Sequence, residues 1–367
     1  MTSSVVFRQV SVRAFRNIGA LDFEPHPAVN LIVGDNGQGK TTLLEALYLA
    51  ATTKSFRADK LEQVIQDGTD LAVVSTEVAE DDLVREQRVA VSKLGRSILL
   101  DGKRTQSTVT YVTRTPVVLF HPGDLALVAS GAAARRTLLD RIALFVEPAS
   151  MMHRARYGRA LQGRQRALAE RGTNAVELDA FEQLAAEHGS ALCRARAVAA
   201  ERLVAALHPI FVQMAPESTE LGAAYRPAGA VLAAEFAREL ATRRRDDLRR
   251  GAATFGPQRD DLELLIDGRS ARRHASQGQQ RLLTLALKVA ELGCLRVARG
   301  AHPVLLLDDV SSELDPERAG AVYRLLDDTE SQVFLTTTRP EVIGGHGTAE
   351  RGRREFVLSG GTLGRAI

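Results

Sequence analysis

The stretch Gly34-Asp35-Asn36-Gly37-Gln38-Gly39-Lys40-Thr41, followed by Thr42, decides the fold of this chain. It matches the pattern G-x-x-x-x-G-K-[ST], in which backbone N–H groups surround the phosphates of a nucleotide. The pattern also occurs by chance, so its flanks matter. The apolar run AVNLIV precedes it and the amphipathic run TTLLEALYLAA leaves it. A strand that enters such a loop and a helix that leaves it indicate an α/β nucleotide-binding domain.

Each part of this loop has a chemical role in that setting. The backbone N–H groups and the positive end of the following helix converge on the β-phosphate. Lys40 would bridge oxygens of the β- and γ-phosphates, and the hydroxyl of Thr41 would ligate Mg²⁺. We therefore predict a site for ATP and Mg²⁺ that is built on residues 34–42.

An acidic pair near the C-terminal end of the sequence completes the predicted site. The residues 304–307 are all apolar, and Asp308 and Asp309 follow them. This pattern predicts a buried parallel strand that ends in two carboxylates. Asp308 would hold Mg²⁺, which prefers oxygen ligands, and Asp309 would orient and deprotonate the attacking water. Two aspartates after a strand are more often a turn or a helix cap, but beside a phosphate loop they indicate catalysis.

A polar turn between these motifs opens an amphipathic helix. Its sequence is Ala275-Ser276-Gln277-Gly278-Gln279-Gln280-Arg281. The residues alone allow an ordinary N-capped helix with Ser276 as the cap. The stretch also resembles the signature motif of ABC-type ATPases, whose Ser and Gly contact the γ-phosphate of ATP held by the other subunit. The resemblance implies that Ser276 and Gly278, with Gln277 and Gln279 beside them, bind ATP in trans within a head-to-tail homodimer.

Two further motifs resemble those of SMC-like ABC-type ATPases. Phe15-Arg16-Asn17 precedes the phosphate loop at the distance typical of that branch, in which the arginine reaches the nucleotide phosphates. This resemblance implies that Arg16 and Asn17 lie at the ATP. The segment 311–315, SSELD, looks like the D-loop that crosses the dimer interface in this superfamily.

Over essentially its whole length the chain resembles the RecF family. The RecF-like strings occur in order: VRAFRNI at 12–18, GDNGQGKTTLLEAL at 34–47, KSFR at 54–57, PGDLALV at 122–128, RRTLLD at 135–140, GPQRDD at 256–261, ASQGQQR at 275–281 and LLLDDVSSELD at 305–315. Asp309 stands where the general ABC pattern has Glu, and Thr336 to Thr338 stand where it has His. A threonine cannot act as a cationic sensor of phosphate. Both features are usual in RecF, and we expect slow hydrolysis from them.

The distribution of strand-like and helix-like patterns indicates three segments. Residues 1–125 and 251–367 are rich in strand patterns, whereas residues 126–250 have apolar residues at helical spacing. We therefore expect an α/β ABC-type ATPase head with a short helical arm inserted between its halves. Residues 1–125 would carry the phosphate loop, and residues 251–367 the signature motif, the Walker B strand and the D-loop.

Arginines cluster in the middle third of the chain, at 154–171 and 243–250. Such clusters can neutralise DNA phosphates, although a solvated helical face is an equally good reading of the composition. Arg57, Arg135 and Arg136 are further candidates for contact with DNA, although Arg57 could equally contact the nucleotide or be a plain surface arginine. The two cysteines match no metal or redox motif, which suits a cytoplasmic protein. The sequence contains no run of 18 apolar uncharged residues, so we expect no membrane-spanning helix.

The resemblance to RecF implies an ATPase that acts as a recombination mediator in DNA replication and repair. Such a protein dimerises on ATP and binds duplex DNA near junctions with single-stranded DNA. Together with RecR and RecO it helps load RecA at gaps. One alternative is a small ABC-type ATP-dependent dimerisation switch that acts on a protein partner and has little role on DNA. Another is a module that holds ATP without hydrolysing it.

Overall fold

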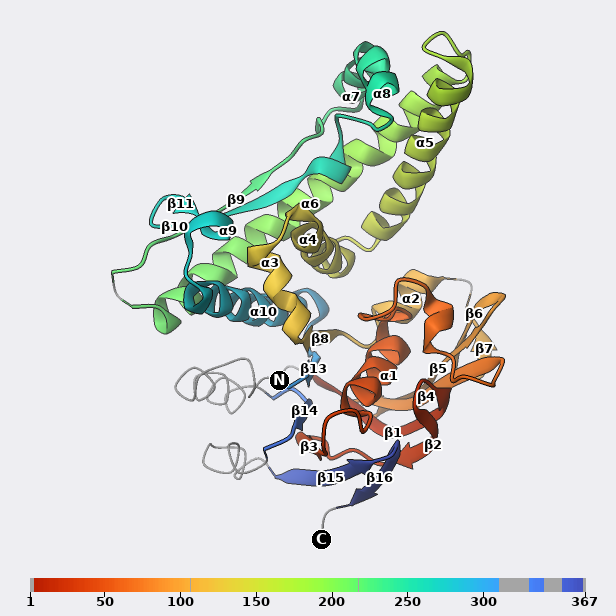
Figure 1. The fold of residues 1–367 in the computed structure, drawn as a ribbon, viewed down its shortest axis with the longest axis vertical. Helices are drawn as coiled ribbons and strands as arrows, with labels where there is room; N and C mark the ends of the chain where they lie inside the picture. Colours follow the sequence, from red (N-terminus) through yellow and green to blue (C-terminus); the bar gives the residue numbers. More distant parts are fainter. Residues whose placement is uncertain (1–2, 106, 217, 310–329, 340–351, 366–367) are drawn as a thin grey trace. The chain divides into compact units, whose positions relative to one another are not determined.

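The computed structural model describes residues 3–105, 107–216, 218–309, 330–339 and 352–365. The chain forms two compact units (Figure 1). Unit 1 combines Met1–Asp124 with Leu295–Ile367, and unit 2 is Leu125–Cys294. The sequence predicted that the second half of the head begins at residue 251, but in the structure unit 1 resumes at Leu295. The reason is that a strand within 251–294 pairs with a strand of the expected arm.

A six-stranded sheet in unit 1 carries the phosphate loop. Its strand order is β16-β15-β3-β14-β13-β8, and all neighbours are parallel except the β15–β16 pair. The strands are β3 Val29–Val33, β8 Val117–Phe120, β13 Val304–Leu307, β14 Val333–Thr337, β15 Arg353–Ser359 and β16 Thr362–Arg365. The strands β3, β14 and β13 and the end strand β8 are almost fully buried, which explains their mainly apolar sequences. Because they are parallel, their carboxyl ends meet at one edge.

A second sheet in unit 1 is mainly antiparallel. Its order is β12-β1-β4-β5-β6-β7, and β2 also pairs with β1. The strands are β1 Ser3–Phe15, β2 Ile18–Phe23, β4 Leu71–Glu80, β5 Leu83–Ser92, β6 Gly95–Leu100, β7 Lys103–Arg104 and β12 Ala301–His302. In β5 buried and exposed side chains alternate, as in a sheet with one covered face.

Helix α1, Lys40–Thr52, contacts strands of both sheets. It begins directly after Gly39, and the φ angles of Gly37 and Gly39, 83° and 109°, are in a region that glycine adopts without steric cost. Most of its side chains are buried, which fixes the phosphate loop to the core of unit 1. The short helix α2, Thr108–Val112, and the turns η1, Leu61–Val64, and η2, Pro122–Leu125, complete the connections.

Unit 2 is built around the long helices α5, Ala149–Arg171, and α6, Leu178–Met214. The other helices are α3 Ala126–Ala129, α4 Ala132–Val146, α7 Ala233–Thr242, α8 Arg244–Arg250, α9 Ala271–His274 and α10 Gln277–Arg299, which extends into unit 1. Three strands, β9 Leu221–Arg226, β10 Asp261–Ile266 and β11 Arg269–Ser270, form a small antiparallel sheet. The turn η3, Pro257–Arg259, precedes β10.

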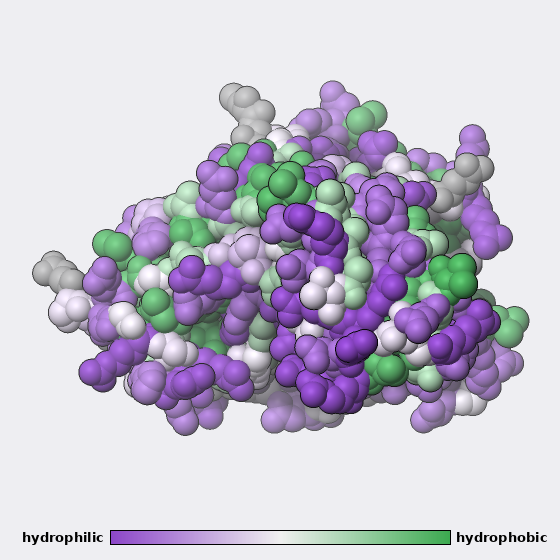
Figure 2. Space-filling model, turned by 90° about the horizontal axis from the view of Figure 1, so that it is seen from above, coloured by the Kyte–Doolittle hydropathy of each residue, from purple (hydrophilic) through white to green (hydrophobic). Residues whose placement is uncertain are grey.

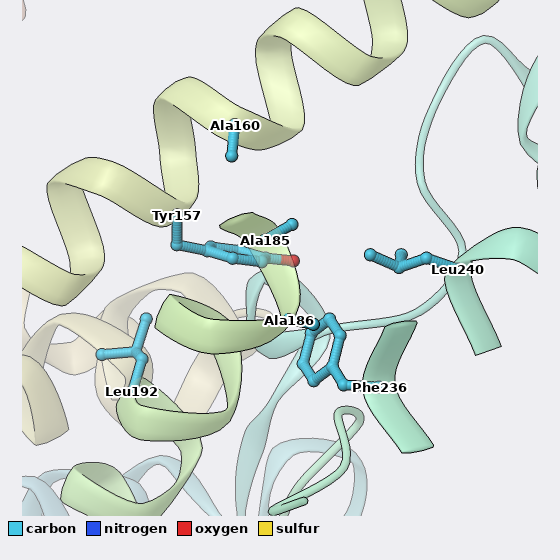
Figure 3. Packing of buried hydrophobic residues seen from close by; sticks show 7 residues of the cluster. All are labelled: Tyr157, Ala160, Ala185, Ala186, Leu192, Phe236 and Leu240. Carbon is cyan, nitrogen blue, oxygen red and sulfur yellow. The ribbon is translucent and has the colours of Figure 1, made fainter. Parts of the chain in front are cut away.

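Small side chains allow the helices of unit 2 to pack closely. Figure 3 shows Tyr157 and Ala160 of α5 facing the alanines 185 and 186 of α6, with Phe236 of α7 beside them. All these residues are buried. At Gly189 an added Cβ would lie 2.7 Å from Phe236 and 2.9 Å from Tyr157, so the two rings occupy the space that a larger residue would need.

Among the described residues, α6 is the one helix long and apolar enough, by length and composition alone, to cross a membrane. It packs against α4, α5 and α7, and helices in the core of a protein pass the same test. The face of the molecule in Figure 2 is mostly hydrophilic, with hydrophobic residues in small groups.

Candidate nucleotide site

The carboxyl ends of β3, β13 and β14 bring three predicted features together in unit 1. The hydroxyl of Thr41, at the start of α1, donates to Oδ1 of Asp308 over 2.9 Å. The hydroxyl of Thr336, in β14, donates to the same oxygen over 2.9 Å. The backbone N–H of Asp309 donates to the hydroxyl of Thr336 over 3.0 Å. The phosphate loop and the acidic pair therefore form one site, as the sequence predicted.

Lys40 is buried inside the phosphate loop. Its Nζ donates to the carbonyl oxygens of Gly34 and Asp35 at 2.6 and 2.9 Å. Burial lowers the pKa of Lys40, while the nearby carboxylates of Asp309, Asp308 and Asp35 oppose that shift. The structure thus places an ammonium group where the loop encloses it and where it can meet phosphate oxygens.

Asp308 has the surroundings of a ligand for a hard cation. Burial raises its pKa, and the hydrogen bonds from Thr336 and Thr41 oppose the shift. A divalent cation would favour the ionised carboxylate that burial disfavours. The adjacent hydroxyl and carboxylate of Thr41 and Asp308 are the two protein ligands that phosphate-loop ATPases give to Mg²⁺. The chemistry of these donors therefore fits the predicted Mg²⁺.

Asp309 has an unusual backbone conformation. Its φ is 49°, in the left-handed region that non-glycine residues seldom adopt. The hydroxyl of Thr336 accepts its N–H and so helps to hold it there. Strained backbone is often found at functional sites, where the surrounding structure maintains it. The conformation is consistent with a residue that must aim its side chain at a substrate.

A cavity of about 360 Å³ joins these groups. It is lined by Arg16, Asn17, Asn36, Gly37, Gly39, Lys40, Thr41, Thr42, Arg57, Asp308 and Asp309. All of these residues were predicted to be functional. Arg57 lines this cavity, as expected for the nucleotide-contact alternative, and its side chain is 43% exposed.

The remaining loop residues position the site. A Cβ at Gly34 would lie 2.4 Å from the carbonyl oxygen of Leu358, so only glycine lets the loop pass β15 this closely. The side-chain oxygen of Gln38 accepts a hydrogen bond from the N–H of Gly360 over 2.6 Å. Its backbone carbonyl accepts a hydrogen bond from the N–H of Gly361. The turn between β15 and β16 therefore supports the phosphate loop.

Sequence reasoning missed Glu45 of α1. Its carboxylate is fully buried and accepts hydrogen bonds from Nε and Nη2 of Arg16 at 2.6 and 2.8 Å. The one signal in the sequence was an acidic residue within the otherwise apolar run TTLLEALYLAA. The neighbouring Asn17 donates to the carbonyl of Gly37 over 3.4 Å, which links the segment 15–17 to the phosphate loop.

The predicted signature segment lies in unit 2. The N–H of Gln279 donates to the hydroxyl of Ser276 over 3.2 Å, and the N–H of Ser276 donates to the side chain of Gln279 over 2.8 Å. This reciprocal pair is a capping box, so the prediction of Ser276 as a helix cap is confirmed. Ser276 and Gln277 are exposed at the start of α10, and Gly278 is partly exposed. Their contact with ATP in trans stays a prediction.

The D-loop expected at 311–315 lies outside the described residues. Within the segment 336–338, Thr338 is exposed beyond the end of β14. The hydroxyl of Thr336 contacts both members of the acidic pair in the structure.

Two predicted DNA-binding arginines have internal partners. Arg135 is buried and forms a bidentate pair with Asp261, at 2.7 and 2.9 Å. It also donates to the carbonyls of Leu127 and Ser130. Arg136 donates to the carbonyl of Asp260 over 2.9 Å. The structure argues against Arg135 as a DNA contact, because DNA would have to replace every one of these bonds.

The arginine clusters of the arm also divide by burial. Arg164 is fully buried between Glu182 and Asp247, and Arg244 pairs with Glu182 and Asp179. The arginines 156, 159 and 166 are exposed on α5, and the structure records no ion pair for them among the described residues. Only part of the predicted basic surface is therefore available to a partner.

Comparisons with known proteins agree with this geometry. The family profile described as RecF/RecN/SMC N terminal domain matches residues 6–349. The DNA replication and repair protein RecF of Anaeromyxobacter dehalogenans strain 2CP-C is 41% identical over 344 residues, which are 90% of this chain and 92% of that protein. RecF of Myxococcus xanthus strain DK1622 is 39% identical over 346 residues, 91% of each chain.

Solved structures are similar over the full length. The structure described as the recombination mediator protein RecF-ATPrS in the RecFOR pathway is 26% identical, with a TM-score of 0.89 and 100% coverage of both chains. An SMC head bound to the C-winged helix domain of ScpA shares the fold, at 15% identity, a TM-score of 0.55 and coverage of 98% of this chain and 96% of that one. The expected SMC-like ABC-type ATPase head is thus confirmed, and this chain belongs to the RecF family.

Proposed function

We propose that this chain is an ATP-dependent recombination mediator of DNA replication and repair. In this proposal the protein acts in the cytoplasm, dimerises on ATP and binds duplex DNA near junctions with single-stranded DNA. It then helps RecR and RecO to load RecA at gaps in the DNA. The observation that carries the proposal is the bond between Thr41 and Asp308, at 2.9 Å, within a cavity lined by the phosphate loop. The similarity to RecF proteins and to the RecF-ATPrS structure supports it.

The residues of the cavity would bind and hydrolyse ATP slowly. When bound, Mg²⁺ would neutralise charge on the phosphates, held by Thr41 and Asp308. Lys40 would contact phosphate oxygens from within the loop. Asp309 would orient the attacking water and accept its proton. Asp309 has one methylene fewer than the Glu of the general ABC pattern, and Thr336 supplies a neutral hydroxyl in place of a His, so a low turnover rate follows.

The signature segment would complete the site of a second copy of the chain. Ser276 and Gln277 are exposed at the positive end of α10, which favours contact with an anion. ATP held between two subunits would stabilise the closed dimer, and hydrolysis would remove the contact made by its terminal phosphate.

Mixing two inactive variants tests this arrangement in trans. A Lys40→Met subunit lacks the phosphate-loop lysine, and a Ser276→Arg subunit lacks the signature serine. Each homodimer has two defective sites, but a mixed dimer has one intact site. We expect the mixture to recover ATPase activity that neither variant has alone. Activity no greater than the sum of the two variants would contradict the arrangement in trans.

Duplex DNA would contact the exposed arginines of α5. Arg156, Arg159 and Arg166 are spaced at i, i+3 and i+10, which places them on one side of the helix. Contacts to the DNA backbone release counterions, so binding should weaken steeply with salt and show little sequence preference. Replacing all three by Gln should lower both the affinity and its dependence on salt.

Sedimentation with and without ATP and duplex DNA tests the whole proposal, with Lys40→Met as the control. We expect the wild type to dimerise with ATP and to carry DNA only then. ATP-driven dimers that ignore DNA would favour a switch acting on a protein partner. A wild type that remains monomeric under all conditions would overturn the proposal. Asp309→Asn, compared with wild type in an ATPase assay, tests hydrolysis separately.

A further inference from the structure

The carboxylate of Glu45 is a buried acceptor that joins two segments beside the nucleotide cavity. Its side chain is 0% exposed. It lies on α1 and accepts from residues before and after that helix. Its donors are Nε of Arg16 at 2.6 Å, Nη2 of Arg16 at 2.8 Å, Oγ of Ser55 at 2.5 Å and, as an ion pair, Nη1 of Arg57 at 3.5 Å.

Ser55 extends this connection to the backbone of the segment 54–58. Its hydroxyl donates to Glu45 and accepts the N–H groups of Arg57, at 2.9 Å, and Ala58, at 2.8 Å. The loop that follows α1 is therefore fastened to the middle of the helix. This fixes the position from which the side chain of Arg57 extends.

The backbone of Arg16 is fixed as well. Its N–H donates to the carbonyl of Val64 over 2.8 Å, and its φ is 51°, in the left-handed region. The two bonds to Glu45 use Nε and Nη2 of the guanidinium. Nη1 takes no part in these two bonds, and Arg16 and Arg57 both line the cavity.

The charges of this cluster favour an anion. One carboxylate faces two guanidinium groups, so the cluster of Glu45, Arg16 and Arg57 has a net positive charge. The negative charge of Glu45 opposes the attraction of the arginines for phosphate. A free arginine, however, loses much side-chain freedom when it binds a ligand, and a buried bidentate partner removes most of that freedom beforehand. The proposal requires that the gain from this preorganisation exceeds the loss of attraction.

We propose that Glu45 is a positioning residue, which holds the guanidinium groups of Arg16 and Arg57 in the cavity for the phosphates of ATP. The inference rests on the proposed function, because it requires ATP in this cavity. Glu45 does not touch the nucleotide in this arrangement and acts through the two arginines.

A double-mutant cycle on ATP affinity tests the proposal in the full-length protein. We expect Glu45→Gln to weaken binding of a fluorescent ATP analogue with Mg²⁺ by about tenfold. In an Arg16→Met background the same change should have a much smaller effect, because the principal group that Glu45 positions is already absent. Ser55→Ala, which leaves all charges in place, should weaken binding less than Glu45→Gln.

Glu80→Gln is the matched control. Glu80 is also a nearly buried carboxylate of unit 1 and accepts from two arginines, Arg85 at 2.7 Å and Arg299 at 2.8 Å, but it does not line the cavity. This variant should lose thermal stability and keep the ATP affinity of the wild type.

These measurements distinguish a failure of the Glu45 proposal from a failure of the proposed function. If Glu45→Gln binds ATP as tightly as wild type, or more tightly, the proposal is wrong. Equal effects of Glu45→Gln with and without Arg16 would likewise show that the residue has only a structural role. If instead wild type fails to bind ATP, or Lys40→Met binds it equally well, the proposed function itself fails.

Discussion

The hydroxyl of Thr336 donates to Oδ1 of Asp308 over 2.9 Å and accepts the N–H of Asp309 over 3.0 Å. A single neutral side chain of β14 therefore contacts both members of the acidic pair at the end of β13. It orients the carboxylate predicted to hold Mg²⁺ and the backbone of the residue predicted to activate water. The consequences of this contact can be measured.

Thr336→Val keeps the shape of the side chain and removes both bonds. We expect ATP turnover to fall about tenfold or more, with ATP affinity changed less than threefold, because the group supports the reacting centre rather than the phosphate loop. Phosphate release and equilibrium binding measure the two effects. Thr338→Val, at an exposed position beyond β14, should behave as wild type. A loss of affinity as large as the loss of turnover would contradict this role.

Gly34→Ala should disrupt the phosphate loop from outside the cavity. The new Cβ would lie 2.4 Å from the backbone oxygen of Leu358, which cannot move without shifting β15. We expect a loss of about 1–3 kcal/mol in the free energy of unfolding together with a loss of ATP binding. Gly19→Ala is the control, since its Cβ would meet only a side chain, at 3.8 Å. Normal ATP binding by Gly34→Ala would refute the argument.

Arg164→Met should destabilise unit 2 strongly. The guanidinium is fully buried and bonds Glu182, Asp247 and the carbonyl of Leu240. Removing it takes a cationic partner from two buried carboxylates, which typically costs about 3–5 kcal/mol. Arg159→Met, on the exposed side of the same helix, should change stability little and weaken binding to DNA. Urea unfolding and DNA titration distinguish the two arginines, and equal stability of both variants would be evidence against their separation.

The stability of unit 2 should depend on pH through His188. Burial lowers its pKa from the ordinary 6.5, and its Nδ1 lies 3.1 Å from Nδ1 of His153. The folded state therefore binds fewer protons than the unfolded state. Stability should be complete above pH 6.5 and fall as the pH drops below it.

Urea unfolding between pH 7.5 and 5 measures this dependence. His188→Gln should reduce the decrease in stability over that range. His208→Gln, at an exposed position of α6, should leave it unchanged. A decrease of the same size in all three proteins would exclude His188 as its source.

The sequence predicted the parts of the fold that depend on local patterns. The phosphate loop was recognisable because an apolar strand and a helix flank its phosphate-binding motif. The acidic strand was recognisable because two aspartates follow an apolar run. That Thr41 and Asp308 meet, across 267 positions, followed from the rule that parallel strands end at one edge. The capping reading of Ser276 was similarly local.

What the sequence could not predict depends on pairing between distant residues. Arg135 and Arg164 look like surface charges in a basic segment, and only their partners Asp261 and Asp247 make them internal. The division of the chain at Leu295 depends on the pairing of β10 with β9. Glu45 was missed because no local rule connects a helix residue with an arginine 29 positions away.

The position of β3 in its sheet has a consequence for the order of synthesis. Its two neighbours, β14 and β15, are the segments 333–337 and 353–359, which the ribosome makes long after the phosphate loop. A nascent chain that has completed the phosphate loop still exposes both edges of the strand that leads into it. Nucleotide binding by the nascent chain should therefore begin only after β15 has left the exit tunnel.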